Sequence, residues 1–208
     1  MSSSSRSPKE VAVRINAVDT GLALEDLTEL LKRGDNIDAI VVPKVQGPED
    51  LHFVADIVRH VAPHRAVRVN GTVSGIPNSP RPLNILALIE SARGLSDITS
   101  ICRAAPTTGL SGLAFAAEDF ATQLGLSRLP DRRGLLFDHS SILTAALAHS
   151  LPSVIDLVSA GVPSDDASRA ALAQDCHEVM RLASRGGSVF IHLKLGLFRK
   201  PLGRRQIV

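Results

Sequence analysis

Short apolar runs alternate along the chain with longer segments in which apolar residues recur every three or four positions. The short runs are typical of buried strands. They predict strands at 11–16, 39–42, 84–90, 112–117, 153–158 and 188–193. The periodic segments predict helices at 25–32, 48–62, 97–103, 135–149 and 165–183. About six strand–helix repeats in a row predict parallel strands joined by helical crossovers, and hence an α/β fold.

Two of the predicted strands end in acidic residues. The apolar stretch 84–89 stops at Glu90, and the stretch 112–117 is followed by Glu118 and Asp119. A carboxylate at the end of a buried strand is costly unless it is paired, and this edge of a parallel sheet is where ligands bind. Two such acids on one edge are suited to a hard cation such as Mg²⁺.

The repeats are compatible with an open doubly wound sheet or with most of a (β/α)8 barrel. The chain has neither a glycine-rich dinucleotide fingerprint nor a phosphate-binding loop. Acids at the strand ends, in place of glycines in the first turn, favour a TIM-type barrel. We divide the chain into a disordered tail at 1–10, a barrel domain at 11–193 and a basic tail at 194–208.

The composition is that of a soluble globular chain of 208 residues. A formal net charge of +2 and the absence of Trp and Tyr argue against a nucleic-acid partner. No apolar run reaches the about 20 residues of a membrane span, so no membrane partner is expected. Residues 1–10 show no clear targeting signal, and we expect the cytoplasm or the mitochondrial matrix. Cys102 and Cys176 are predicted to be buried, reduced thiols.

Six short motifs, in order and spacing, resemble the citrate lyase beta-subunit-like branch of the HpcH/HpaI aldolase family. They lie at 13–16 (VRIN), 26–31 (DLTELL), 43–45 with 49–50 (PKV and ED), 88–94 (LIESARG), 115–120 (FAAEDF) and 155–158 (IDLV). The resemblance implies a TIM-type barrel, a bound Mg²⁺, and cleavage or formation of a C–C bond beside a carbonyl. It also implies an acyl-CoA thioester and a 2-keto acid as partners, and a homo-oligomer, commonly a trimer.

Carried over to this chain, the resemblance assigns Glu90 and Asp119 as metal ligands. It assigns Arg14 as the catalytic residue, which binds the keto acid together with Glu90. Glu118 and Lys44 are expected to support the site from behind the ligands. Structural roles stay open beside these, because Glu90 could cap a helix or pair with Arg93 and Lys44 could be merely solvated. Asp156 and His192 are expected to be structural.

The chain departs from the family pattern in three places. Only ten residues precede the predicted strand that contains the VRIN segment, where the family has two further strand units, so we expect a barrel that lacks its first two units. Ala116 stands where the family has glycine, and the family's closing motif is replaced by 184–193.

Three functions follow from these observations. The leading expectation is a magnesium-dependent lyase that cleaves a malyl-, citramalyl- or citryl-type 3-hydroxyacyl-CoA to an acyl-CoA and a 2-keto acid. The alternatives are an aldolase on free 4-hydroxy-2-oxo acids and an inactive or binding-only remnant of the family.

Overall fold

The computed structural model describes residues 11–33, 36–66, 82–125 and 133–156, together with 166, 170, 190–191 and 206–207. The strands are β1 (Ala12–Arg14), β2 (Ala39–Val42), β3 (Asn84–Ile89), β4 (Leu110–Phe115), β5 (Ser153–Asp156), β6 (Phe190–Ile191) and β7 (Gln206–Ile207). The α-helices are α1 (Ala23–Lys32), α2 (Pro48–Val61), α3 (Ala92–Ser96), α4 (Ile98–Arg103), α5 (Ala105–Thr108), α6 (Ala117–Gln123) and α7 (Leu136–Ala148). Short 3-10 helices are η1 (Val18–Thr20), η2 (Pro63–Arg65) and η4 (Arg133–Leu135).

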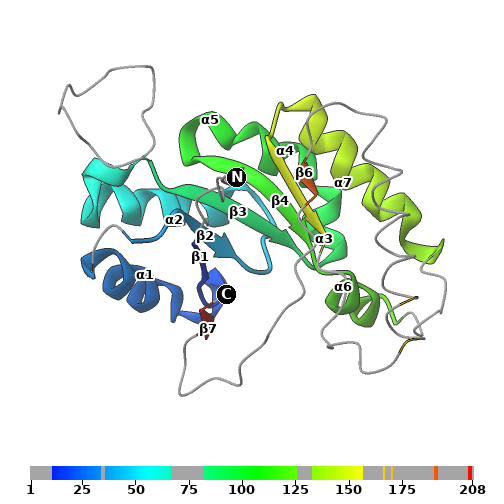
Figure 1. Cartoon of the computed structure of the whole chain (residues 1–208), viewed down its shortest axis with the longest axis horizontal. Helices are drawn as coiled ribbons and strands as arrows, with labels where there is room; N and C mark the ends of the chain where they lie inside the picture. Colours follow the sequence, from blue (N-terminus) through cyan, green and yellow to red (C-terminus); the bar gives the residue numbers. More distant parts are fainter. Residues whose placement is uncertain are drawn as a thin grey trace, which may run out of the picture.

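The strands form one sheet in the order β6-β5-β4-β3-β2-β1-β7. From β1 to β6 each strand pairs in parallel with the next one along the chain, and β7 runs antiparallel to β1. A doubly wound sheet would reverse this order at a switch point and carry helices on both faces. Because parallel crossovers are right-handed, an unreversed order puts the crossover helices on one face, as in a barrel wall. Figure 1 shows the helices on the outside of the curved sheet.

The α/β fold predicted from the sequence is therefore confirmed, and the strand order is that of a barrel rather than of a doubly wound sheet. Among the described strands, β6 and β7 are the two edges, so these strands make a barrel wall and not a closed ring.

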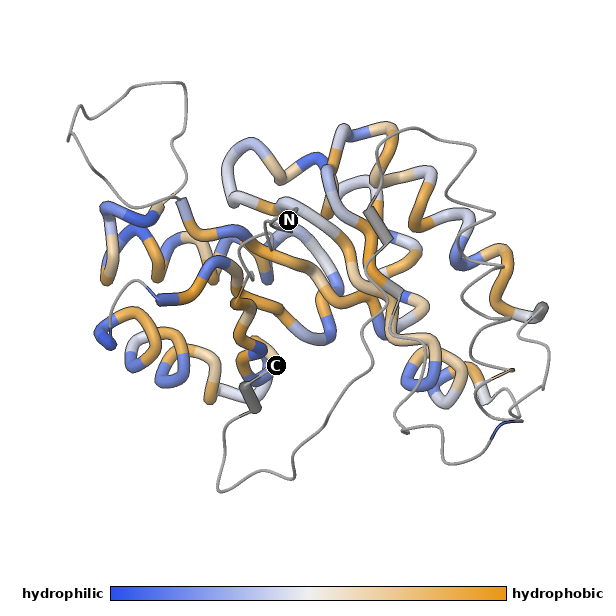
Figure 2. Tube along the Cα trace, viewed as in Figure 1, coloured by the Kyte–Doolittle hydropathy of each residue, from blue (hydrophilic) through white to orange (hydrophobic). Residues whose placement is uncertain are grey.

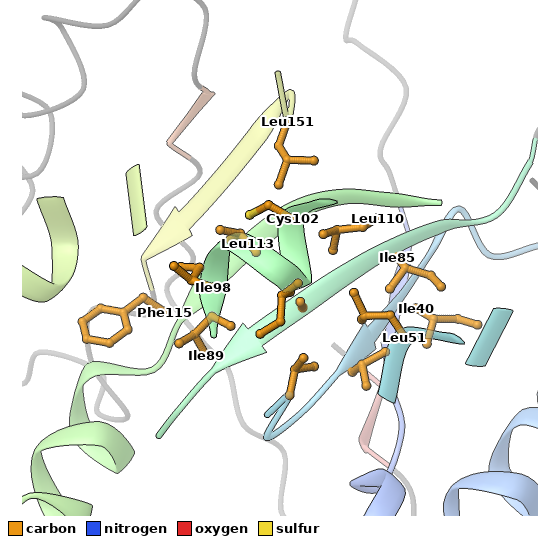
Figure 3. Close-up of a cluster of buried hydrophobic side chains, with 14 of the residues drawn as sticks. Ile40, Leu51, Ile85, Ile89, Ile98, Cys102, Leu110, Leu113, Phe115 and Leu151 are labelled. Carbon is orange, nitrogen blue, oxygen red and sulfur yellow. The ribbon is translucent and has the colours of Figure 1, made fainter. Parts of the chain in front are cut away.

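The two faces of the sheet are buried to different extents. The helix-covered face holds a large apolar core that includes Ile40, Ile85, Ile89, Leu113 and Phe115 (Figure 3). Figure 2 shows hydrophobic residues along the central strands and in alternating bands on the helices, as expected of helices that bury one side. The opposite face carries only a small cluster. Its members are Leu88, Ala114 and Ala116, with Val41 and Ile155 packed against them.

Helix α2 shows how the local sequence sets an element. Pro48 occupies the first helical turn, where its missing N–H costs no hydrogen bond, and Glu49 and Asp50 follow it in the same turn. The residues it buries recur at helical spacing and are Leu51, Val54, Ala55 and Val58. The predicted helix at 48–62 is thus confirmed to within one residue.

Other boundaries differ from the prediction. Strand β4 begins at Leu110 and ends at Phe115, because Leu110 pairs with Ile85 and the next two alanines turn into α6. Strand β4 is followed directly by a seven-residue helix, α6. The helix expected at 97–103 is one of three consecutive helices, α3 to α5, that break at Asp97 and Ala104.

Strand β7 was not predicted. It lies inside the segment 194–208, which the sequence suggested was a tail, and pairs Gln206 with Arg14 and Ile207 with Val13. Cys102 is buried as expected, and burial raises the pKa of its thiol to about 11. The helix predicted at 165–183 lies outside the described residues, save 166 and 170, as do Cys176 and His192.

None of the helices in the described ranges is long and apolar enough to cross a lipid bilayer.

Candidate active site

The residues singled out from the sequence come together at the C-terminal ends of four neighbouring parallel strands. Arg14 is the last residue of β1, Lys44 follows β2 by two residues, and Glu90 follows β3 directly. Glu118 and Asp119 lie in the first turn of α6, just after β4. Parallel pairing places these ends at one edge of the sheet, which is the edge where α/β proteins bind ligands.

Arg14 and Glu90 form an ion pair across this edge. The Arg14 Nη2 atom lies 3.7 Å from the Glu90 Oε1 atom, and their side chains are 27% and 3% exposed. Val13 and Ile89 pack into the core under the helices, so strand alternation points Arg14 and Glu90 to the opposite face. Strand β2 lies between β1 and β3, and the long guanidinium arm spans it.

Glu90 is buried without full compensation. Its Oε1 atom is buried and has no hydrogen-bond partner. Burial raises the pKa of Glu90 above its ordinary value, and the negative charge of Asp119 raises it further. The positive charges of Arg14 and Lys44 lower the pKa of Glu90 but do not outweigh burial. A buried carboxylate oxygen without a partner is suited to a cation that the site would receive from solution.

Hydrogen bonds of the two residues after Arg14 hold the end of β1 against its neighbours. Just after β1, the backbone N–H and the Nδ2 of Asn16 both donate to the Asp26 carboxylate in α1, at 2.9 and 2.6 Å. The Ile15 N–H also donates to the Val41 carbonyl at 3.2 Å, which extends the β1–β2 pairing. The VRIN and DLTELL segments are therefore joined in the fold by hydrogen bonds two residues after Arg14.

The turn after β2 approaches the turn after β3 very closely. The Val45 N–H donates to the Leu88 carbonyl at 3.2 Å. A Cβ atom on Gly94 would lie 2.3 Å from the Val45 carbonyl oxygen, so only glycine fits there. Between the buried residues Pro43 and Val45, the exposed Lys44 is held at a left-handed φ of 52°. Such a backbone conformation costs about 1–3 kcal/mol and persists where its surroundings impose it.

The Glu90 loop and α6 are also tied together. Ser91 caps α3, since its Oγ accepts the Gly94 N–H at 3.0 Å. The Ala92 N–H donates to Gln123 Oε1 at 2.9 Å, and the Ala116 N–H donates to the Ile89 carbonyl at 3.2 Å. Sequence reasoning missed Gln123, because no motif or spacing links it to a residue 31 positions away.

Ala116 fits without strain where the family pattern has glycine. Its φ is −99°, which any residue adopts, and its side chain is buried in the small cluster with Leu88 and Ala114. The added methyl group therefore packs against the sheet.

The donor set fits Mg²⁺ held by few protein ligands. The described residues contain no group of three or more His, Cys, Asp or Glu side chains that could hold a metal ion. Mg²⁺ is commonly bound by one or two carboxylates and keeps waters or substrate oxygens in its other positions. Glu90 and Asp119 supply two carboxylates, and Asp119 is the acid whose charge acts on Glu90.

The acids near the site differ in the partners and the exposure that the structure gives them. Glu90 pairs with Arg14, whereas Arg93 lies 3.9 Å from Glu49 on the exposed surface. Glu118 is half-buried and next to the exposed Asp119. Asp156 ends β5 opposite Phe115. His192 lies outside the described residues.

A model of the HpcH/HpaI aldolase/citrate lyase family matches residues 3–190 of the chain. The chain belongs to this family. The family resemblance inferred from the six motifs is thereby confirmed, and the match covers the described strands and helices from β1 to β5, reaches the first residue of β6 and leaves out β7.

Several characterised proteins of this kind are similar to the chain. Human mitochondrial citramalyl-CoA lyase is 29% identical over 157 residues, which are 73% of this chain and 42% of that protein. The citrate lyase subunit beta of Leuconostoc mesenteroides subsp. cremoris is 32% identical over 139 residues, 67% of this chain and 41% of that protein. The chain thus spans about two fifths of the length of these relatives.

A solved structure has the same fold. The citrate lyase beta subunit from M. tuberculosis, complexed with oxaloacetate and magnesium, superposes with a TM-score of 0.58 at 25% sequence identity. The match covers 88% of this chain and 67% of that one.

Proposed function

We propose that this member of the HpcH/HpaI family is a magnesium-dependent C–C lyase. Its substrate would be a 3-hydroxyacyl-CoA of the malyl, citramalyl or citryl type, and its products an acyl-CoA and a 2-keto acid. The observation that carries the proposal is the buried Glu90, whose Oε1 atom has no hydrogen-bond partner and faces a guanidinium at the ligand-binding edge. The similar lyases support the substrate class.

In this proposal Glu90 and Asp119 hold the metal, and Arg14 binds the keto-acid portion. The metal, when bound, supplies a Lewis acid for the carbonyl oxygen of the 2-keto acid. Arg14 would donate hydrogen bonds to the same oxygen, which carries negative charge once the hydroxyl has lost its proton and becomes the carbonyl oxygen of the 2-keto acid as the C–C bond breaks. The hydroxyl proton passes to a base, the electron pair of the C–C bond becomes the thioester enolate, and protonation of that enolate releases the acyl-CoA.

Lys44 and Glu118 lie behind this centre. The exposed Lys44 ammonium lowers the pKa of Glu90 and so helps to keep it ionised for the metal. Glu118, half-buried beside Asp119, would hold the first turn of α6 in place. We extend the proposal to a homo-oligomer, a trimer by the family resemblance, in the cytoplasm or the mitochondrial matrix; the similar human lyase is mitochondrial.

The test is an assay of the purified chain with malyl-CoA and citramalyl-CoA in the presence and absence of Mg²⁺. Release of a 2-keto acid that needs Mg²⁺ and is lost in Glu90→Gln supports the proposal. The matched control is Glu49→Gln, the same change at an exposed acid. Pyruvate released from 4-hydroxy-2-oxo acids, with no turnover of thioesters, would identify an aldolase instead. Absence of Mg²⁺ binding in calorimetry would favour the binding-only remnant, and light scattering tests the oligomer.

A further inference from the structure

Glu90 and Asp119 lie on a small ring of backbone that two hydrogen bonds close. One bond joins the ends of the strands, from the Ala116 N–H to the Ile89 carbonyl at 3.2 Å. The other joins the helices that follow, from the Ala92 N–H to Gln123 Oε1 at 2.9 Å. Glu90 lies between Ile89 and Ala92 on one side of the ring. Asp119 lies between Ala116 and Gln123 on the other.

The second bond is made by a side chain from the same face of α6 as Asp119. Asp119 and Gln123 are four residues apart in the helix, so they lie one above the other on one side. The partner of Gln123 is the N–H of the first residue of α3, one of the donors that a helix leaves without an internal partner. The bond therefore sets how far the Asp119 face of α6 stands from the end of β3.

We propose that Gln123 is a positioning residue that fixes the separation of the Glu90 and Asp119 carboxylates for the metal. This inference rests on the proposed function, since it takes the two acids as the ligands. It adds a residue that touches neither the metal nor the substrate and acts through the backbone of the Glu90 loop.

Loss of the bond should leave α6 folded. Phe120 is 1% exposed and packs edge-on against Phe115, with 5.3 Å between the ring centroids. The Phe120 N–H also donates to the Ala116 carbonyl at 3.0 Å. These contacts keep the helix on the sheet, whereas its far end, at Gln123, is attached to α3 by the amide.

The experiment compares Gln123→Met, which keeps the length and loses the acceptor, with Gln123→Glu, which keeps an acceptor. Thr122→Val is the matched control, because it removes the Thr122 hydroxyl bond to the Glu118 carbonyl inside α6 and leaves Ala92 untouched. In metal-free protein, hydrogen exchange at the Ala92 amide should speed up in Gln123→Met alone. Calorimetry should show Mg²⁺ affinity about tenfold weaker in Gln123→Met, at the lower end of losses for residues behind metal ligands. At saturating Mg²⁺ the turnover should recover.

Wild-type Mg²⁺ affinity in Gln123→Met, despite faster exchange at Ala92, would overturn the positioning role. So would an equal loss in Thr122→Val, which would indicate general loosening of α6. Unchanged exchange at Ala92 in Gln123→Met would refute the bond itself. If the wild-type chain binds no Mg²⁺, the metal site and with it the proposed function are refuted. Hydrogen exchange in metal-free protein still tests the Ala92–Gln123 bond in that case, because it does not depend on the metal.

Discussion

Replacing Glu90 by glutamine should make the metal-free protein more stable at neutral pH. The glutamate side chain is 3% exposed, and its Oε1 atom has no hydrogen-bond partner. Leaving a buried polar group unpaired costs about 1–3 kcal/mol. Arg14 offsets part of this cost, so we take the lower end and expect Glu90→Gln to raise the free energy of unfolding by about 1 kcal/mol. In a chain of this size that corresponds to about 2–4 °C in Tm. Arg14 is 27% exposed, and water can solvate it once its partner is neutral.

The pH dependence of this gain has a definite sign. Burial holds the pKa of Glu90 in the folded protein above its ordinary value, so between the two pKa values the folded state keeps a proton that the unfolded state has already lost. The stability contributed by Glu90 therefore falls as the pH rises from the unfolded pKa through the folded one. The advantage of Glu90→Gln should be small at about pH 4, where the wild-type carboxyl is mostly protonated in both states, and largest above the folded pKa.

Mg²⁺ should reverse the order of stability. A ligand that binds only the folded state stabilises it by about 2.7 kcal/mol when present at 100 times its Kd. The wild type should gain this amount and Glu90→Gln should not. The assay is urea unfolding at pH 4 and pH 7, with chelator and with Mg²⁺, and Glu49→Gln as a control that changes stability by less than about 0.5 kcal/mol. If Glu90→Gln is less stable than wild type at pH 7 in chelator, the ion pair with Arg14 stabilises the fold and the reasoning fails.

Three further predictions follow from the same geometry. In Arg14→Gln, the loss of a charge that lowers the pKa of Glu90 should move the pH at which Mg²⁺ binding is half-lost upward, as measured by calorimetry from pH 5 to 8; an unchanged midpoint would contradict the coupling. Gly94→Ala should destabilise the protein by about 1–3 kcal/mol in urea unfolding, since the new Cβ would meet the Val45 carbonyl oxygen at 2.3 Å; a neutral effect would mean that this turn relaxes freely. Cys102, with its pKa raised to about 11, should resist a thiol reagent at pH 8 until the chain unfolds; peptide mapping that finds rapid labelling would refute its burial.

The sequence predicted the strands best where burial on both faces leaves a continuous apolar run. The strand predicted at 39–42 coincides with β2, and the strand predicted at 84–90 runs one residue past the end of β3. The prediction failed where the pattern is ambiguous. Ala116 and Ala117 read as a continuation of β4, yet they belong to the turn and to α6, because small apolar residues suit either state. Strand β7, two residues long, has no period to detect.

The candidate site was predicted as a set of residues, and its geometry was not. Strand ends and motif likeness pointed to Arg14, Glu90 and Asp119, since parallel strands bring such ends to one edge. The contact of Arg14 with Glu90 depends on the strand order, which places β2 between them. The bond from Ala92 to Gln123 is a meeting of a backbone amide and a surface side chain, for which the sequence holds no pattern.

Residues of different motifs contact one another in this fold. These contacts explain why Glu90→Gln is expected to raise the free energy of unfolding and Gly94→Ala to lower it. The Asn16 amide bonds to Asp26 just after β1, and the Val45 carbonyl lies against Gly94 just after β3. Both contacts are therefore close in sequence to the strand ends that carry Arg14 and Glu90. The surrounding frame thus supplies the stability that holds an unfavourably buried acid in place. Replacing the acid should therefore raise the free energy of unfolding, whereas a side chain in the space at Gly94 should lower it. An acid kept at a cost to stability is what a metal or substrate site requires, because the ligand then restores the missing partner.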